Sequence, residues 1–183
     1  MADPVLHGLL VIGEAPGADE DREGKGFVGR SGKLLQNLLG QHGFVRGRDY
    51  GCANVVRCRP AGNRPPSAAE TWDCLPYLAQ TIATSCPCVI LCVGRSASTI
   101  FLGSGTLLSH ILDADGRQKA GYPDLHPQLL PVSAVITQIP VIPMPHTSPL
   151  AWNRVSPDGR GWAEIGRAQV NRAVTLAGVL STR

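Results

Sequence analysis

The feature that most constrains the fold is an alternation of short apolar runs with segments of helical periodicity. Four runs are typical of buried strands because each is short and apolar: residues 9–13, 50–56, 89–93 and 139–144. Apolar residues recur at helical spacing in residues 31–40, 67–82, 96–102 and 162–180. Strands that alternate with helices predict a mostly parallel sheet covered on both faces. We therefore expect an α/β fold, a three-layer α/β/α domain with a central, mostly parallel four-stranded sheet. Residues 103–138 show no clear period, and we expect an irregular excursion there with one short strand or helix.

Length and composition are those of one folded domain. The chain has 183 residues, of which 43% are hydrophobic and 17% charged, so it can bury a substantial core and is not expected to be disordered. No secretory signal pattern opens the sequence, and no apolar run approaches the roughly 20 residues of a membrane span. We expect a single domain over residues 1–183, soluble and cytoplasmic, working as a monomer without membrane contact. The formal net charge of +3 permits a nucleic-acid partner without indicating one.

A long glycine-rich loop follows the first predicted strand. It runs from Glu14 to Arg30 and holds several acidic residues beside the lone aromatic Phe27. A loop of this length in a compact domain is usually functional or disordered, and this composition favours function. In α/β proteins, the carboxyl end of a strand that feeds a glycine-rich turn is where ligands bind. The loop is therefore the first place to look for a functional site.

Three motifs, spaced along the chain, carry a family resemblance. The first is Gly-Glu-Ala-Pro-Gly at residues 13–17, followed by Phe-Val-Gly-Arg-Ser-Gly at 27–32. The second is Asn-Val-Val-Arg-Cys-Arg-Pro at 54–60 with Asn-Arg at 63–64, and the third is His-Thr-Ser-Pro-Leu at 146–150. In content, order and approximate spacing they resemble the uracil-DNA glycosylase superfamily, most closely family 4, the bacterial and archaeal type. The resemblance implies a DNA repair glycosylase whose partner is uracil-containing DNA. Such an enzyme flips uracil out, hydrolyses its N-glycosidic bond and leaves an abasic site.

The residue types in these motifs suit the recognition of a flipped base. A glycosylase extrudes its target nucleotide into a pocket that reads the Watson–Crick edge, and Phe27 offers an apolar face on which the base can stack. Asn54 carries an amide that can both donate and accept. It would pair with uracil O4 and N3–H and would meet the amino group of cytosine with a donor. An asparagine inside an apolar strand needs a partner, which favours a ligand role over loop capping. We also expect the peptide N–H of Ala15 to face the uracil, because the turn exposes backbone there.

Candidates for the chemistry are one histidine and two carboxylates. His146, in the third motif, could donate a hydrogen bond near uracil O2 and stabilise the departing anion. The attacking water needs a base or an anionic partner, and a carboxylate would also stabilise the cationic sugar. The resemblance implies that Glu14 and Glu20 are both functional. We favour Glu14 for the water or for electrostatics and Glu20 for pocket shaping, and which of them positions the water stays open. This mechanism requires no metal.

Residues around the motifs are candidate DNA contacts. As a group, the arginines beside the motif loops are interpreted as phosphate contacts, which predicts salt-sensitive binding. In the third motif, Thr147 stands where the family usually has proline, and Pro149 where it often has an aromatic residue. By resemblance, Leu150 is the wedge that replaces the flipped base and Trp152 a nearby groove contact, although the altered loop favours single-stranded substrate. The predicted DNA-binding residues are Arg57, Arg59, Arg64, Lys33, Ser148, Leu150 and Arg154, with Lys25 and Arg30 flanking the pocket.

The cysteines raise the question of a cofactor. Six cysteines in a cytoplasmic chain are free thiols or metal ligands rather than disulfides. Family 4 members hold a four-iron four-sulfur cluster through four cysteines, and Cys58 and Cys74, separated by fifteen residues, match the later two ligands. The family places the other pair ahead of the first strand, where this sequence has none, and two thiolates do not complete a cluster. We therefore expect no cofactor, unless the natural chain extends upstream.

Two other functions stay open on the sequence alone. Residues 24–31 approximate a phosphate-binding P-loop, but such a loop joins a strand directly to a helix. Here the strand ends at Gly13, eleven residues earlier. The second alternative is a catalytically weak or inactive DNA-binding member of the same superfamily, supported by the absent cysteine pair and by Thr147. Against it, the full set of candidate pocket residues occurs together.

Overall fold

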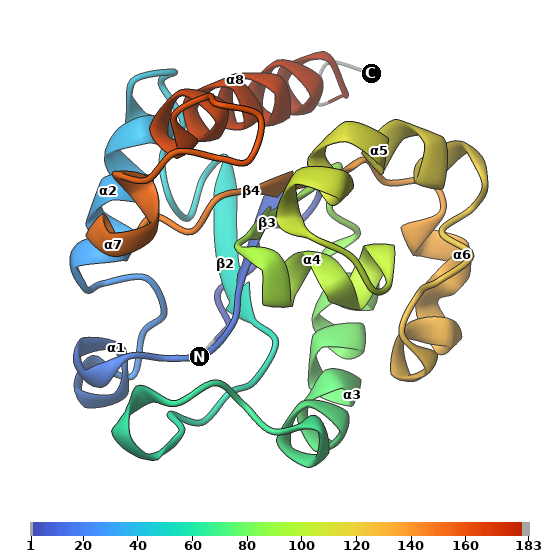
Figure 1. Cartoon of the computed structure of the whole chain (residues 1–183). Coiled ribbons are helices and arrows are strands. Elements are labelled where there is room, and N and C mark those ends of the chain that lie inside the picture. Colours follow the sequence, from blue (N-terminus) through green and yellow to red (C-terminus); the bar gives the residue numbers. More distant parts are fainter. Residues whose placement is uncertain (1, 181–183) are drawn as a thin grey trace.

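The four apolar runs form one parallel sheet in the computed structural model, which describes residues 2–180 (Figure 1). Its strands are β1 (Leu9–Gly13), β2 (Tyr50–Asn54), β3 (Val89–Val93) and β4 (Val141–Met144), in the order β2-β1-β3-β4. Each neighbouring pair is parallel, so the predicted α/β fold is confirmed and the sheet is parallel throughout. The second strand ends two residues before its predicted end, and the fourth begins two residues after its predicted start.

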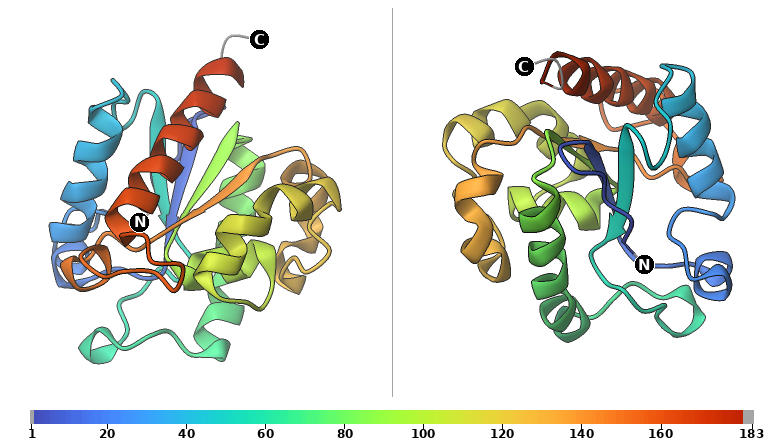
Figure 2. Two further views of the ribbon diagram at one scale, coloured as in Figure 1. Left: turned by 45° about the horizontal axis from the view of Figure 1, so that its top comes forward. Right: turned by 180° about the vertical axis from the view of Figure 1, so that it is seen from behind.

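Both faces of the sheet are covered, because side chains along each strand alternate between two core clusters. In β1, Leu10 and Ile12 belong to one cluster, while Leu9 and Val11 belong to the other. The first cluster packs under α3 (Ala68–Ser85), α4 (Arg95–Leu102) and α6 (Ser133–Ile136). The second packs under α2 (Arg30–Gly40) and α8 (Trp162–Leu180). Figures 1 and 2 show these two helical layers on opposite sides of the sheet.

The predicted helix boundaries are largely confirmed, and local capping explains them. The hydroxyl of Ser67 accepts a hydrogen bond from the Glu70 N–H at 3.1 Å, and the Glu70 carboxylate accepts one from the Ser67 N–H at 2.7 Å. This reciprocal capping box satisfies two of the N–H groups that a helix leaves unpaired at its start. The last helix spans the predicted residues 162–180. None of the helices described over residues 2–180 is both long and apolar enough to cross a membrane.

The expectation for residues 103–138 was wrong. This segment contains α5 (Leu107–Lys119), the 3-10 turn η2 (Pro127–Val132) and α6. Helix α5 is capped by Thr106, whose side chain accepts a hydrogen bond from the Ser109 N–H, and the helix buries His110, Ile111 and Ala114. Serine in place of the usual acid at the capping position, with a glycine inside the helix, weakened the helical signal in the sequence.

The long loop after β1 also contains regular structure. A short helix, α1 (Ala18–Glu23), starts after Gly17 and ends at Gly24, which adopts a left-handed conformation with φ 66°. Its first turn is acidic, which suits the positive end of a helix dipole. Helix α2 then begins after Gly29 and carries the chain back along the sheet. The loop from Glu14 to Arg30 is therefore ordered around α1.

Candidate active site

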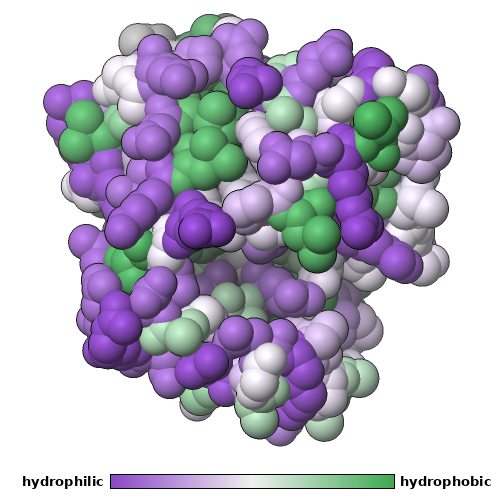
Figure 3. All heavy atoms as spheres, turned by 60° about the vertical axis from the view of Figure 1, so that its left-hand side comes forward, coloured by the Kyte–Doolittle hydropathy of each residue, from purple (hydrophilic) through white to green (hydrophobic). Residues whose placement is uncertain are grey.

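A cavity of about 320 Å³ lies at the carboxyl edge of the sheet. Figure 3 shows the corresponding face hollowed by a cleft with a mostly hydrophilic rim. The lining comes from residues 13–20 at the end of β1, Phe27 and residues 29–32, residues 54–64 in part, and residues 146 and 147 after β4. Strand β1 lies between β2 and β3, so the direction of the chain order reverses beside it. Parallel α/β sheets bind ligands at such a switch point, and the volume falls within the usual range for ligand pockets.

Gly13 is where the two base-recognition candidates meet. It pairs with Asn54 in the β1–β2 register. A side chain at this glycine would place its Cβ 2.5 Å from the Asn54 Oδ1 and 2.7 Å from the Phe27 ring. Only glycine leaves room for this approach, so the amide and the ring converge on the end of β1. The structure brings together two residues that lie 27 positions apart in the sequence.

Phe27 is held in a conformation that a non-glycine residue rarely adopts. Its φ is 58°, a left-handed value that persists where the surroundings enforce it and that clusters at functional sites. The side chain of Gln36, on α2, donates a hydrogen bond to the Phe27 carbonyl oxygen at 2.6 Å. The ring itself is 9% exposed and joins the core cluster under α2 and α8. Helix α2 therefore fixes the ring against the end of β1.

Glu20 accepts hydrogen bonds from three backbone N–H groups of its own loop. Its carboxylate binds Gly17 at 3.1 Å, Val28 at 2.9 Å and Gly29 at 2.8 Å. A carboxylate with these partners joins the beginning and the end of the loop, on either side of α1. This geometry supports the pocket-shaping role that the sequence favours for Glu20.

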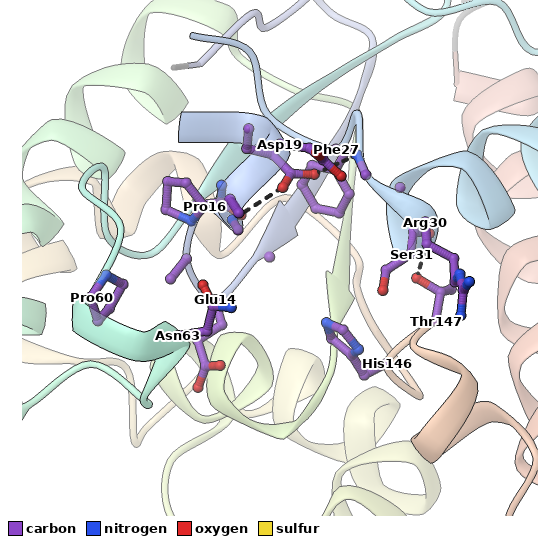
Figure 4. A pocket seen from close by; sticks show the side chains of 18 of the residues that line it. Glu14, Pro16, Asp19, Phe27, Arg30, Ser31, Pro60, Asn63, His146 and Thr147 are labelled. Atoms are coloured by element: carbon purple, nitrogen blue, oxygen red, sulfur yellow. Dashed lines mark hydrogen bonds between the residues drawn. The ribbon is translucent and has the colours of Figure 1, made fainter. Parts of the chain in front are cut away.

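Glu14 has a different environment. Its carbonyl oxygen accepts from the Val56 N–H at 3.0 Å, which extends the β1–β2 ladder beyond the strands and fixes its backbone. Its carboxylate Oε1 accepts a hydrogen bond of 2.5 Å from the hydroxyl of Ser96. That length lies at the short end of the range for a hydroxyl that donates to a carboxylate. Figure 4 shows the Glu14 side chain reaching into the cavity, with His146 entering it from another segment.

His146 is half-buried and oriented by its own loop. The Ser148 N–H donates to its Nδ1 at 3.0 Å, so in the neutral ring the proton resides on Nε2. Burial lowers the pKa of His146, and the charge of Glu14 partly opposes that effect. The imidazole is therefore neutral at pH 7. A neutral ring with its proton on Nε2 can donate one hydrogen bond toward the cavity.

Thr147 ties the third motif to the first. Its side chain is 1% exposed, and its hydroxyl donates to the Ser31 carbonyl oxygen at 2.8 Å, a bond drawn in Figure 4. A proline at this position could not make that bond. The departure from the family pattern thus brings a specific contact between the loop after β4 and the start of α2.

The arginines of the second motif have partners within the protein. Arg57 donates to the Tyr77 carbonyl oxygen at 3.0 Å, and its guanidinium lies 4.7 Å from the centre of the Tyr77 ring. Arg64 forms two hydrogen bonds of 2.7 Å with the Glu70 carboxylate. Arg59 donates to the Asn63 side chain at 2.7 Å, beside the 3-10 turn η1 (Ala61–Asn63). These contacts support a structural role for Arg57 and leave the phosphate role of all three a prediction.

The other predicted DNA contacts are exposed or half-buried. Leu150, on the short helix α7 (Pro149–Trp152), is 71% exposed, and Ser148 caps that helix with its side chain. Lys33 and Arg154 are also exposed. Trp152 corrects the sequence-based expectation: it is 6% exposed and packs so closely on Gly166 of α8 that a Cβ there would lie 2.4 Å from its ring. It supports α7 from inside and cannot contact a groove.

Three residues near the cavity were not singled out as site residues in the sequence. Ser96 binds Glu14, Gln36 binds the Phe27 backbone, and Asn63 lines the cavity. Serine and glutamine on helices carry no motif signal of their own, because only the fold brings them to their partners. For Asn63 a signal existed, since it belongs to the second motif.

The residues described do not fit an iron–sulfur cluster by themselves. Cys58 is exposed and Cys74 is half-buried. Within residues 2–180, no group of three or more histidine, cysteine, aspartate and glutamate side chains is arranged to hold a metal ion. A four-iron cluster needs four thiolates, and the two that match the family pattern supply half of them.

The fold and the cavity define a class: an α/β protein with a ligand pocket at the switch point of a parallel sheet. Comparison with known families identifies which one. The family model of the uracil DNA glycosylase superfamily matches residues 3–165, and the chain belongs to that superfamily. This membership confirms the resemblance drawn from the three motifs.

Similar relatives share the name type-4 uracil-DNA glycosylase. That of Pyrobaculum aerophilum is 47% identical over 111 residues, which cover 60% of this chain and 56% of the relative. The relative from Archaeoglobus fulgidus is 43% identical over 90 residues, 49% of this chain and 45% of the relative. That of Thermotoga maritima is 42% identical over 94 residues, 51% and 48% of the two chains. The chain spans about half the length of the relatives it matches.

Proposed function

We propose that this protein is a monofunctional uracil-DNA glycosylase, which flips uracil out of DNA and hydrolyses the bond between uracil N1 and the deoxyribose C1′. One observation carries the proposal. The amide of Asn54 and the ring of Phe27 converge on Gly13, in a cavity that Glu14 and His146 also line. A stacking surface, a donor–acceptor amide, a neutral imidazole and a carboxylate are the groups that recognition and excision of a flipped base require.

Recognition of the base rests on Phe27 and Asn54. The base stacks on the Phe27 ring, an interaction worth roughly 1–3 kcal/mol. The Asn54 amide donates to uracil O4 and accepts from N3–H. Cytosine presents an amino group and an unprotonated N3 instead, so both contacts would be mismatched and buried, which disfavours it strongly. The backbone N–H of Ala15, which lines the cavity, supplies a further contact to uracil.

Departure of the base rests on His146. When the C1′–N1 bond breaks, its electron pair leaves with uracil and the charge spreads to O2. The imidazole donates from Nε2, because Nδ1 is already engaged by the Ser148 N–H. A neutral donor stabilises the uracil anion without first losing a proton to it. Single donors of this kind contribute about 10²–10³ in rate.

Attack by water rests on Glu14. As the bond to uracil breaks, C1′ becomes cationic, and the negative carboxylate stabilises that charge. Water then bonds to C1′, and its proton passes to the carboxylate, which leaves an abasic sugar. Glu20 is committed to backbone N–H groups and shapes the wall of the pocket. No step of this mechanism passes through a metal or an iron–sulfur cluster, and we propose that the protein holds none. An iron assay with visible absorbance tests whether a cluster is present.

The DNA contacts are the predicted residues Lys33, Arg59, Leu150 and Arg154. Leu150 is the exposed apolar residue beside the third motif, and it fills the gap left by the flipped base. We further propose that the protein works as a monomer in the cytoplasm.

The experiment is incubation with single- and double-stranded oligonucleotides that contain one uracil, followed by alkaline cleavage of abasic sites. We expect a cleaved product from uracil but not from cytosine or thymine. Asn54→Ala and His146→Ala should each lower the single-turnover rate by about 10²-fold or more, with DNA affinity retained. Binding of DNA without any product from either substrate would replace this proposal with a DNA-binding role.

A further inference from the structure

The contact between Ser96 and Glu14 joins two neighbouring strands at the switch point of the sheet. Glu14 follows β1, and Ser96 lies in the first turn of α4, which follows β3. The hydroxyl donates to the carboxylate Oε1 at 2.5 Å, across 82 positions of sequence. The hydroxyl lies within reach of Glu14, although Ser96 itself does not line the cavity.

Ser96 does not use its hydroxyl to cap its own helix. The residue that caps α4 is Gly94, at φ 90°, a backbone conformation that strongly favours glycine. Other hydroxyls on this helix bond back to it: Ser98 donates to the Gly94 carbonyl oxygen at 2.8 Å, and Thr99 to that of Arg95 at 2.9 Å. Ser96 alone among these three donates to a residue outside the helix. The Ser96 hydroxyl therefore holds a residue that lines the cavity and makes no hydrogen bond to its own helix.

The turn that carries Ser96 is fixed and also touches His146. The Gly94 N–H donates to the Met144 carbonyl oxygen at 2.8 Å, at the end of β4. A Cβ at Gly94 would lie 3.5 Å from the Cβ of His146 and 3.6 Å from its ring. The turn from Gly94 to Ser96 thus lies against both proposed catalytic groups: Gly94 lies close to His146, and Ser96 donates to Glu14.

We propose that Ser96 is a positioning residue for Glu14: it holds one carboxylate oxygen so that the other faces the reacting sugar and water. This inference rests on the proposed function and deepens it. A free glutamate side chain has several rotatable bonds, and each orientation that misses C1′ is unproductive. The turn that begins at Gly94 sets the spacing between the Glu14 carboxylate and the His146 imidazole.

The test is a set of variants in the single-turnover excision assay with saturating enzyme. Ser96→Ala should lower the rate of excision about tenfold, the loss that a hydrogen bond to a charged group carries, with DNA affinity unchanged. Ser96→Thr keeps a hydroxyl and should recover most of the rate. Thr99→Val removes a hydroxyl from the same helix without touching Glu14 and should match the wild type.

A double-mutant cycle separates positioning from a general structural effect. In a Glu14→Ala background, Ser96→Ala should cause no further loss, because its partner is absent. An undiminished loss in that background, or an equal loss in Thr99→Val, would overturn the inference. So would a Ser96→Ala variant as active as the wild type. A wild type that releases no uracil would instead remove the proposed function itself, so the two failures are distinguishable.

Discussion

The first loop holds two carboxylates whose surroundings are opposite in kind. Glu20, in α1, accepts hydrogen bonds from three backbone N–H groups through its carboxylate oxygens. Glu14, directly after β1, has its backbone held by the Val56 N–H just beyond β2 and one carboxylate oxygen held by a single hydroxyl. The hydrogen-bond partners of each carboxylate thus distinguish a structural role from a chemical one. A carboxylate whose oxygens bind many N–H groups of its own loop organises the backbone, whereas one held at a single point can still act on a ligand.

Glu14→Gln should separate these roles most strongly. The amide keeps the size and a bond to Ser96 but loses the charge that stabilises the sugar cation and accepts the proton of water. We expect the single-turnover rate to fall by about 10²–10⁴-fold, while thermal stability stays at the wild-type value. Quench-flow or manual sampling of uracil release, with a melting curve as control, measures both. A loss of stability comparable to that of a Glu20 variant would erase the contrast between the two carboxylates.

Glu20→Gln should show the reverse pattern. It removes the charge from three hydrogen bonds and places an NH₂ donor where the loop needs an acceptor, so the free energy of unfolding should fall by about 2 kcal/mol. Excision should fall less than in the Glu14 variant, because the pocket wall is loosened and no reacting group is removed. Urea unfolding gives the stability, and the excision assay gives the rate. A rate loss larger than that of Glu14→Gln would move Glu20 into the chemistry.

Thr147→Val extends the comparison to the third motif with a smaller effect. The substitution preserves volume but leaves the Ser31 carbonyl oxygen, in a part-buried hydrogen bond, without its donor, a loss of about 1 kcal/mol in the free energy of unfolding. Thr147→Pro, which restores the residue usual in the family, should lose the same bond. If both variants keep wild-type stability and rate, the tie between the first and third motifs has no energetic role.

The pH dependence of the excision rate is expected to show the smallest effect. Because burial lowers the pKa of His146, the imidazole should stay neutral as the pH falls through about 6.5, the usual histidine value. The excision rate should therefore hold constant there and decline only at lower pH, where protonation of Nδ1 breaks the bond from Ser148. Unfolded chains take up that proton at higher pH than the folded protein, so stability also falls with pH from the usual value downward. A midpoint at or above 6.5 in the rate profile would contradict the neutral assignment.

Much of the architecture was predictable from local patterns. The strand beginning at Leu9, the capping pair Ser67 and Glu70, and the last helix follow from apolar runs, capping chemistry and helical spacing, all of which act within a few residues. Residues 107–119 were missed because their helical signal is diluted by polar residues, and burial against β4 and α4 supplies what the sequence pattern lacks. Trp152 was predicted to contact a DNA groove because it lies beside the third motif. In the folded protein, α8 packs against its ring and buries it.

The parallel sheet, the family and the set of candidate site residues could all be predicted from the sequence, because residue type and local period carry that information. The separate roles of those residues depend on their contacts in the folded protein. It showed that Glu20 binds backbone while Glu14 enters the cavity, that Arg57 lies on Tyr77, and that Thr147 reaches Ser31. The partner of Glu14 could not have been chosen beforehand, because Ser96 is one serine among several until β3 is placed beside β1. Hydrogen bonds between distant segments depend on distances of a few tenths of an ångström, and a linear pattern contains no such distances.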